Sequence, residues 1–398
     1  MTYWTYKSGL IQTYTLPYVR LMAGHLEPGR RISLVTFEQP GMALTAGERD
    51  AALAELQRDK IDWISLSYNR FSFKALLQNF IFLVRLVGIC RRAEIATIHC
   101  FCTPAGAIGY FLSLLTGIPL VIDSYEPHAE AMVENGTWTR SSLPFKLLFF
   151  LEALQSRRAS AIVATTEGMR GYAKAKYGAE FTRFYVKPAC VDVELFKREG
   201  LKTDELAESL GLKGKIVCIY AGKIGGIYLE REIFDLLKAA SDRWGNRFRA
   251  ILLTDAGAER MRGLCAASGF DYGALIHLFV NHREIPPYMA LADFALTPVR
   301  PVPSKRLCAP IKDGEYWAMG LPVIITADIA EDSAMIEQYG IGVVLRGFSG
   351  EHCARAIGEI EALLQGNSNT DLHDKIRGVA VATRGMGIAK QVYDGLYG

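Results

Sequence analysis

The sequence lacks several features that would each assign it to a particular class of protein. Its eight cysteines form no Cys-x-x-Cys pair, so we expect reduced thiols in a reducing compartment. No stretch of about 18 uninterrupted apolar residues could span a membrane, and the opening MTYWTYKSGL has no apolar signal-peptide core. The sequence therefore predicts a cytoplasmic protein, or one peripheral on the inner face of a membrane.

The sequence also lacks an excess of charge of one sign. Its 45 Lys and Arg residues nearly balance 42 Asp and Glu residues, so we expect no nucleic-acid partner, and any phosphate site must be local. No internal repeat or low-complexity tract is present. With 398 residues, of which 50% are hydrophobic, the chain is globular and long enough for two domains.

Apolar runs of strand length do recur along the chain, separated by segments of helical length. Such alternation predicts parallel sheets covered by helices on both faces, an α/β class with two doubly wound domains. The runs are ISLVTF (32–37), IDWISLSY (61–68), IATIHCF (95–101), IPLVIDSY (118–125), SAIVATT (160–166), RFYVKPA (183–189), KIVCIYAG (215–222), FRAILLTD (248–255), LIHLFV (275–280), FALTPV (294–299), PVIIT (322–326) and IGVVLR (341–346).

The boundary between the two domains is predicted within the charged segment 191–205. We place it near residue 195, which gives domains at 1–195 and 196–385. The last segment, about 386–398, is helical in composition but follows glycine interruptions. We therefore expect it to leave the second domain and pack back onto the first.

The glycine-rich turn YAGKIGG, 220–226, follows an apolar strand and precedes a helix. In open α/β sheets, ligands bind beyond the carboxyl ends of strands. Gly222 would let backbone N–H groups approach an anion there, and Lys223 could meet phosphate charge. The alternative is an ordinary glycine turn with a solvated lysine, because such loops are weak motifs on their own.

The stretch KDGEYWAMGLPVI, 312–324, combines charged residues with the start of a helix. Pro310 suits the first turn of that helix, whose free N–H groups and positive dipole end would suit a diphosphate. Lys312 adds a cation, and Glu315 lies on the same helix face. A carboxylate there could accept hydrogen bonds from two ribose hydroxyls; the alternative is a surface glutamate paired with Lys312.

The pattern Pro-x-Lys-x-x-Glu-Tyr-x-Ala-x-Gly-x-Pro-Val-Ile resembles the donor-site signature of family 4 glycosyltransferases of the GT-B fold. Three further segments resemble parts of that family in the right order: PLVIDSYEPHAE, VKPACVDVELF and VNHREIPPYMALADFALTPV. The resemblance implies two Rossmann-like domains that face each other across a cleft. It also implies an acceptor mainly on the first domain, a nucleotide sugar mainly on the second, and transfer with retention of configuration.

The same resemblance implies roles for individual residues of the second domain. Glu315 would hold the ribose, Lys223 and the turn formed by Ala309, Pro310, Ile311 and Lys312 would hold the diphosphate, and the loop at Val280 and Asn281 would border the base. Two family residues are missing. A second glutamate is replaced by Leu307, and a second phosphate lysine is absent near Tyr228, so Lys312, Lys305 or Arg306 would have to substitute.

In the first domain, the loop DSYEPHAE, 123–130, follows a strand where many relatives carry a histidine; that position is Tyr125 here, with Glu126 and His128 after it, and these three are the catalytic candidates. A general base or oxyanion partner could come from Asp123, Glu126, His128 or Glu130. Helix capping or positioning of the acceptor is the alternative. Gly9, in the first strand-to-helix turn, would let a diphosphate or the acceptor approach the backbone, unless it only forms a tight turn.

Two apolar stretches with basic flanks, 73–92 and 143–158, could be core helices or could face a membrane surface. Within the second, LLFFL is apolar on every helix face. We expect a lipid-linked or growing glycan as acceptor, in the synthesis of cell-surface polysaccharide, and an anionic membrane surface as a further partner.

No Asp-x-Asp motif is present, so the sequence predicts no metal and no cofactor. It predicts a metal-independent hexosyltransferase that uses a UDP- or GDP-sugar as donor. The alternatives are a non-hydrolysing nucleotide-sugar epimerase and a non-catalytic partner subunit of the same fold.

Overall fold

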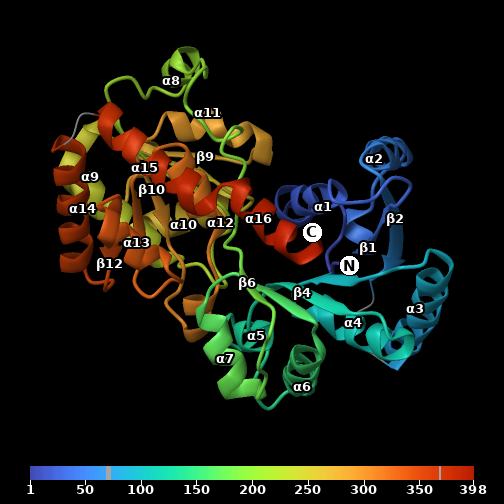
Figure 1. The fold of residues 1–398 in the computed structure, drawn as a ribbon. Coiled ribbons are helices and arrows are strands. Elements are labelled where there is room, and N and C mark those ends of the chain that lie inside the picture. Colours follow the sequence, from blue (N-terminus) through green and yellow to red (C-terminus); the bar gives the residue numbers. More distant parts are fainter. Residues whose placement is uncertain (69–72, 367–368) are drawn as a thin grey trace. The chain divides into compact units, whose positions relative to one another are not determined.

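The computed structural model describes residues 1–68, 73–366 and 369–398. The chain divides into two compact units, and Figure 1 draws their elements in colours that follow the sequence. Unit 1 comprises Met1–Pro188 and Gly387–Gly398, and unit 2 comprises Ala189–Met386. The terminal helix α16 (Met386–Tyr397) thus lies almost entirely in unit 1. The sequence-based domain boundaries were near residues 195 and 385.

All twelve strands predicted from the sequence are present, and their pairing is parallel. The α/β class with two parallel-sheet units is therefore confirmed. Unit 1 contains β1 (Ile32–Glu38), β2 (Ile61–Ser67), β3 (Ile98–Phe101), β4 (Leu120–Tyr125), β5 (Ala161–Ala164) and β6 (Phe184–Val186). Unit 2 contains β7 (Ile216–Ala221), β8 (Phe248–Leu253), β9 (Leu275–Leu278), β10 (Phe294–Thr297), β11 (Val323–Thr326) and β12 (Gly342–Leu345).

The helices lie between these strands, as the alternation predicts. In unit 1 they are the π-helix η1 (Ile11–Thr15), α1 (Leu16–Ala23), α2 (Ala46–Arg58), α3 (Phe73–Arg92), α4 (Thr103–Thr116), α5 (His128–Glu134), α6 (Leu143–Arg158) and α7 (Gly168–Tyr177). In unit 2 they are α8 (Asp204–Ser209), α9 (Arg231–Trp244), α10 (Ala258–Ser268), the 3-10 helix η5 (His282–Glu284), α11 (Ile285–Ala290), α12 (Ile311–Ala318), α13 (Asp332–Tyr339), α14 (Gly350–Gln365) and α15 (Asn369–Arg384).

The sheet of unit 2 has the strand order β12-β11-β10-β7-β8-β9. The chain proceeds in one direction from β7 and in the other from β10, so a topological switch point lies between these two strands. Ligands of open α/β sheets bind at such a point, beyond the carboxyl ends of the strands. The glycine turn after β7 and the segment from β10 to α12 therefore meet where a ligand is expected.

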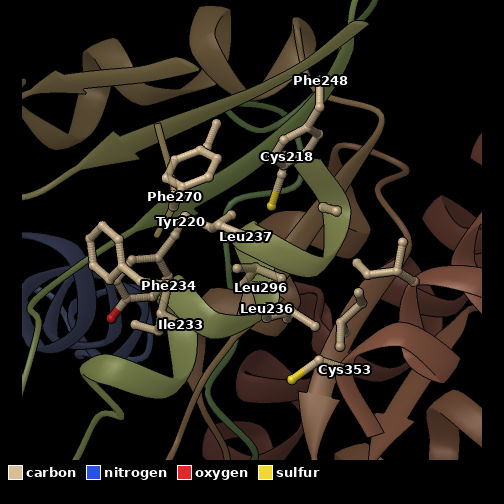
Figure 2. Close-up of a cluster of buried hydrophobic side chains, with 14 of the residues drawn as sticks. Cys218, Tyr220, Ile233, Phe234, Leu236, Leu237, Phe248, Phe270, Leu296 and Cys353 are labelled. Atoms are coloured by element: carbon tan, nitrogen blue, oxygen red, sulfur yellow. The ribbon is translucent and has the colours of Figure 1, made fainter. Parts of the chain in front are cut away.

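Both faces of this sheet are covered by helices. On one face α9 buries Ile233, Phe234 and Leu237, which recur at helical spacing, against β7, β8 and β10, as Figure 2 shows. On the other face Trp317 and Tyr316 of α12 belong to a second cluster, which also includes residues of α11, α13 and α15. The two clusters explain why the strands of unit 2 are apolar on both faces.

In unit 1 an extended N-terminal segment lies between a two-stranded sheet, β1-β2, and a four-stranded sheet, β3-β4-β5-β6. The Thr2 amide donates to the Val35 carbonyl at 3.0 Å, and the Phe101 amide donates to the Met1 carbonyl at 2.8 Å. The N-terminal segment therefore bridges the two sheets and brings the turn that follows it to their carboxyl ends.

Candidate functional site

The glycine turn after β7 lies against a side chain from α12, so a larger residue in place of its first glycine would displace the end of that side chain. Gly222 has φ 153°, and a Cβ atom there would lie 2.3 Å from Lys312 Cε and 2.9 Å from its Nζ. Gly225 and Gly226 also have positive φ, 86° and 68°. The structure thus brings Gly222 and Lys312 together from two elements at the switch point.

The Lys312 ammonium lies among aromatic side chains. Its Nζ donates to the Tyr228 hydroxyl at 2.8 Å and lies 4.0 Å from the centroid of the Tyr228 ring. Lys223 is exposed, and its carbonyl accepts a hydrogen bond from Tyr220. Two cations therefore lie at the glycine turn, one fixed by Tyr228 and one on its exposed side.

A third cation, Arg260 of α10, reaches the same turn and was missed from the sequence. A Cβ atom on Gly225 would lie 2.8 Å from Arg260 Nη2, and Arg260 Nε donates to Glu230 Oε1 at 2.7 Å. Arg306, one of the predicted substitutes for the absent lysine, instead pairs with Asp328 at 2.8 Å. Arg260 could not be predicted as a substitute, because it lies about 30 residues after the position near Tyr228 where the family lysine is missing.

The turn before α12 places Pro310 immediately before the helix, whereas the sequence predicted it within the first turn. Pro310 is the residue that precedes the helix, with φ −68° and ψ 129°, and the helix begins at Ile311. Ala309 is buried, whereas Pro310, Ile311 and Lys312 are half-buried. The first N–H groups of the helix lack partners within it, which suits an anion.

Glu315 is 5% exposed, and its Oε1 lies 2.6 Å from His282 Nε2. The His282 ring packs against Phe196 with its centroid 5.2 Å away. Glu315 is therefore not paired with Lys312, which was the alternative reading of the sequence. His282 was not selected from the sequence, although it directly follows the residues predicted to border a base.

Val280 and Asn281 lie between β9 and η5. Val280 is half-buried, while Asn281 is exposed. The backbone amide and the side-chain amide of Asn281 both donate to Glu284 Oε2, at 2.9 and 3.0 Å. Glu284 therefore holds this loop through hydrogen bonds. The loop leads directly to His282, which is the hydrogen-bond partner of Glu315.

In unit 1 the 123–130 loop starts with a strained residue. Ser124 has φ 51°, a left-handed conformation that is uncommon for residues other than glycine. Tyr125 is fully buried, and its hydroxyl is 2.6 Å from Ser156 Oγ; burial raises the pKa of Tyr125. Tyr125 therefore points into the core, away from any substrate at the surface.

Glu126 and His128 lie at the end of this loop and are both half-buried. The His128 ring is 6.3 Å from the Trp4 ring, so the loop lies near the end of the N-terminal segment. By contrast, Gly9 is exposed, and a Cβ atom there would meet nothing within 4 Å. Among the residues that the structure describes, no close backbone approach requires glycine at position 9.

Behind the loop, two buried carboxylates hold the backbone. Asp123 Oδ2 accepts from Tyr393 at 2.7 Å, and Asp123 Oδ1 lies 3.2 Å from the Lys187 ammonium. Burial opposes ionisation of this carboxyl, yet Lys187 and His99 keep the pKa of Asp123 below its ordinary value. The structural role of Asp123 could not be separated from a catalytic one by sequence alone.

Glu152 of α6 is the second buried carboxylate, and it too was missed. Its Oε1 accepts from the Ala129 amide at 3.0 Å and the Thr103 hydroxyl at 2.7 Å, while Oε2 accepts from Tyr177 at 2.8 Å. Burial raises the pKa of Glu152 to about 7, although these hydrogen bonds oppose the rise. Glu152 thereby fixes the start of α5, where His128 lies.

Comparison with known proteins gives matches at the level of domain and fold. Residues 11–190 match the family described as "Glycosyl transferase 4-like domain". A comparison with curated protein sequences found no match.

Three solved structures resemble the chain over nearly its full length. HepE of Anabaena in complex with UDP-glucose has a TM-score of 0.71 at 15% identity and covers 99% of this chain and 98% of its own. The lipopolysaccharide glycosyltransferase WaaG has a TM-score of 0.71 at 14% identity, with 100% and 98% covered. Sucrose-phosphate synthase of Thermosynechococcus elongatus has a TM-score of 0.70 at 16% identity, and the match covers 96% of this chain and 90% of the synthase chain.

These matches confirm the resemblance read from the motifs, since the family match covers most of unit 1 and the structural matches cover both units. Residues 11–190 match the glycosyl transferase 4-like domain, and the whole chain has the GT-B fold of these glycosyltransferase structures.

Proposed function

We propose that the protein is a glycosyltransferase that moves a sugar from a nucleotide sugar to an acceptor hydroxyl. The observation that carries this proposal is the position of Lys312, whose ammonium lies over Gly222. Lys312 belongs to α12, the same helix that carries the buried Glu315. A cation, a glycine turn and a helix N-terminus suit a diphosphate, and a carboxylate suits a ribose. HepE, which shares the fold, was crystallised with UDP and with UDP-glucose.

The donor in this proposal is a UDP- or GDP-hexose bound to unit 2. Lys312, Lys223 and the turn from Ala309 to Lys312 hold its diphosphate, with Arg260 as an additional cation at the glycine turn. Glu315 binds the ribose hydroxyls while it shares its carboxylate with His282. The Val280–Asn281 loop borders the base.

Transfer proceeds with retention and without a metal ion in this proposal. The charge that develops on the leaving diphosphate is met by lysine, arginine and the α12 N-terminus, so catalysis depends on positioning and electrostatic stabilisation. Glu126 and His128 lie near the acceptor hydroxyl as candidates for proton transfer. Tyr125 stabilises their loop from within the core, through Ser156.

The acceptor in this proposal is a lipid-linked glycan of a cell-surface polysaccharide pathway, reached from the cytoplasmic side of an anionic membrane. Adjacent helices α3, α4 and α6 expose large apolar side chains, and their sequences contain one acidic residue, the buried Glu152. Apolar side chains beside cations such as Arg85 and Lys146 suit anionic lipid. The exposed apolar residues are Phe80, Ile81, Val84, Phe111, Leu114, Leu115, Leu143, Leu147 and Phe150.

The interpretation of LLFFL as apolar on every face is refined by these exposures. Phe149 contacts Tyr177 with ring centroids 5.4 Å apart, whereas Phe150 is 59% exposed. Side chains of residues 73–77 and 79, within the other apolar stretch, lie outside the described residues. In the part of the chain that the structure describes, no helix is long and apolar enough to cross a membrane.

A thermal-shift screen of the full chain with nucleoside mono- and diphosphates tests the donor site. We expect UDP or GDP to raise the melting temperature, and Lys312→Ala to abolish that rise. Lys238→Ala, a lysine on α9 paired with Asp242, is the control and should respond like the wild type. If the nucleotide raises the melting temperatures of Lys312→Ala and Lys238→Ala equally, the proposed site is refuted.

Two other activities are distinguished by their products. An epimerase changes the donor sugar when it is incubated with a nucleotide sugar alone, because it needs no acceptor. A non-catalytic partner subunit binds the nucleotide without turnover.

A further inference from the structure

Asp313 lies on the opposite side of α12 from the two residues assigned to the donor. At about 100° per residue, Lys312 and Glu315 are about 60° apart around the helix, whereas Asp313 is about 100° from Lys312 and about 160° from Glu315. Asp313 is fully buried. A carboxylate in this position has no route to solvent, so its surroundings within unit 2 must explain it.

Those surroundings include a second carboxyl group, Asp332, and a cation, Arg384. Thr297 at the end of β10 donates to Asp313, and Arg384 at the end of α15 pairs with Asp332 of α13. All three charged residues are at most 1% exposed. One arginine can neutralise one carboxylate, and an unpaired buried charge is very costly, so the other carboxyl must keep its proton.

The shared proton belongs on Asp313. Asp332 is a charged neighbour of Asp313, and two ionised carboxylates beside each other in a buried site would repel each other. Burial raises the pKa of Asp313 well above its ordinary value, and Asp332 raises it further. The pKa of Asp332 is also raised by burial, but Arg384 opposes that rise. Neutral Asp313 therefore joins Thr297 to the Asp332–Arg384 ion pair.

The same side of α12 packs against the segments at the two ends of unit 2. A Cβ atom on Gly314 would lie 2.9 Å from Val191 Cγ1 and 3.3 Å from Arg384 Cβ. The Val191 amide donates to the Arg384 carbonyl at 2.8 Å, and Val191 forms a bridge with Gly385. Close contact at Gly314 and the hydrogen bonds of Asp313 therefore fix the helix to the same pair of segments.

We propose that Asp313 is a positioning residue for the donor site. With Asp332 and Arg384 it fixes the buried side of α12, so that Lys312 and Glu315 on the opposite side are held ready for a nucleoside diphosphate. This role rests on the proposed function of that site. The two acidic residues of the Lys-Asp-Gly-Glu sequence thus have different roles: Asp313 positions the helix, and Glu315 binds the ligand.

The test is the affinity of the full chain for UDP, or for GDP if the screen selects it, measured by calorimetry. Asp313→Ala should weaken binding about tenfold, because small displacements of binding groups reduce affinity strongly. Asp313→Asn should remain within about twofold of the wild type, since an amide can accept from Thr297 and donate to Asp332. Asp313→Leu, which has the branched shape of aspartate but no hydrogen-bonding group, should weaken binding as Asp313→Ala does, whereas a merely space-filling role would leave its affinity near that of the wild type.

Gly314→Ala gives an independent variant if Asp313→Ala does not fold. Its Cβ atom should displace α12 from Val191 and weaken binding about as much, whereas Gly358→Ala on α14, where a Cβ atom would meet nothing within 4 Å, should have no effect. Wild-type affinity in Asp313→Ala or in folded Gly314→Ala, or a weak Asp313→Asn, would overturn the positioning role. If no nucleoside diphosphate binds the wild type, the proposed function fails, and this role fails with it.

Discussion

Glu315 shows how one side chain can be partly predicted from sequence. Its spacing from Lys312 predicts that both lie on one face of α12, and a resemblance to a donor motif suggests the ribose. Its hydrogen bond with His282 was not predictable, because His282 lies in a loop 33 residues earlier. The same holds for Arg260 and Glu152, whose positions depend on how distant segments pack.

Replacing Glu315 with alanine should weaken binding of UDP or GDP by about 1–3 kcal/mol, or roughly 5- to 150-fold, because ribose hydroxyls lose their acceptor. Calorimetry on the folded variant measures this loss. Glu337→Ala is the control, since Glu337 is a helix-surface acid paired with Arg346 at 2.6 Å. A Glu315→Ala variant that binds like this control would remove Glu315 from the site.

Lys312→Ala and Lys223→Ala should each weaken binding of the nucleoside diphosphate much more than binding of the free nucleoside. The reason is that both ammonium groups act on phosphate charge. We expect the larger effect from Lys312, whose position is fixed by Tyr228. Titrations of each variant with the nucleoside diphosphate and with the nucleoside measure the two affinities. If a variant loses the same affinity for both ligands, its lysine lies outside the site.

Glu152 makes a prediction about stability and pH. Its pKa in the folded protein, about 7, lies above the ordinary 4.5, so the folded state binds the proton more tightly than the unfolded state. The stability gained from that proton is full below about pH 4.5 and is lost as pH rises to about 7, a change of roughly 3 kcal/mol. In Glu152→Gln this contribution should be absent.

Denaturant melts of wild type and Glu152→Gln across pH 4–8 measure the difference. The stability of the variant relative to the wild type should rise with pH and level off near pH 7. A difference that stays constant with pH would mean that Glu152 has an ordinary pKa.

At the scale of elements, the strands were predictable because each is a largely apolar run of strand length, and such runs are visible in the sequence. The N-terminal segment that bridges the sheets of unit 1 was not predicted, because MTYWTY contains no apolar run of strand length. The orientation of α6 was also hidden. A helix that is apolar all round does not reveal which side faces the core.

The α6 surface can be tested with liposomes. The double change Leu147→Ser and Phe150→Ser should weaken salt-sensitive binding to anionic vesicles while the protein stays folded, because both side chains are exposed. Val381→Ser, at an apolar residue of α15 that is 51% exposed, is the control in unit 2. Co-sedimentation measures binding, and a melting curve confirms folding.

Phe149→Ser should behave differently, because Phe149 packs against Tyr177 and Phe145. We expect it to lower stability by about 3–5 kcal/mol. A wild type that never sediments with anionic vesicles, or a double variant that still does, would contradict the membrane proposal.

At the scale of the whole molecule, the order of motifs predicted two parallel-sheet units and the GT-B fold, since alternation and spacing are preserved along the entire chain. The residues that complete the site come from separate segments of each unit. Lys312 meets Gly222 across 90 positions, and Gly314 packs against Val191 at the start of unit 2. Such pairings follow from tertiary packing, which a single sequence does not display.

Product analysis tests the central claim most directly. The full chain is incubated with UDP- and GDP-hexoses and a membrane lipid extract, in EDTA and in magnesium, and nucleotide and sugar products are identified by mass spectrometry. We predict release of UDP or GDP with the hexose attached to a lipid-linked acceptor or to water, at the same rate in EDTA. An epimerised nucleotide sugar, nucleotide binding without release, or release that requires magnesium would contradict the account.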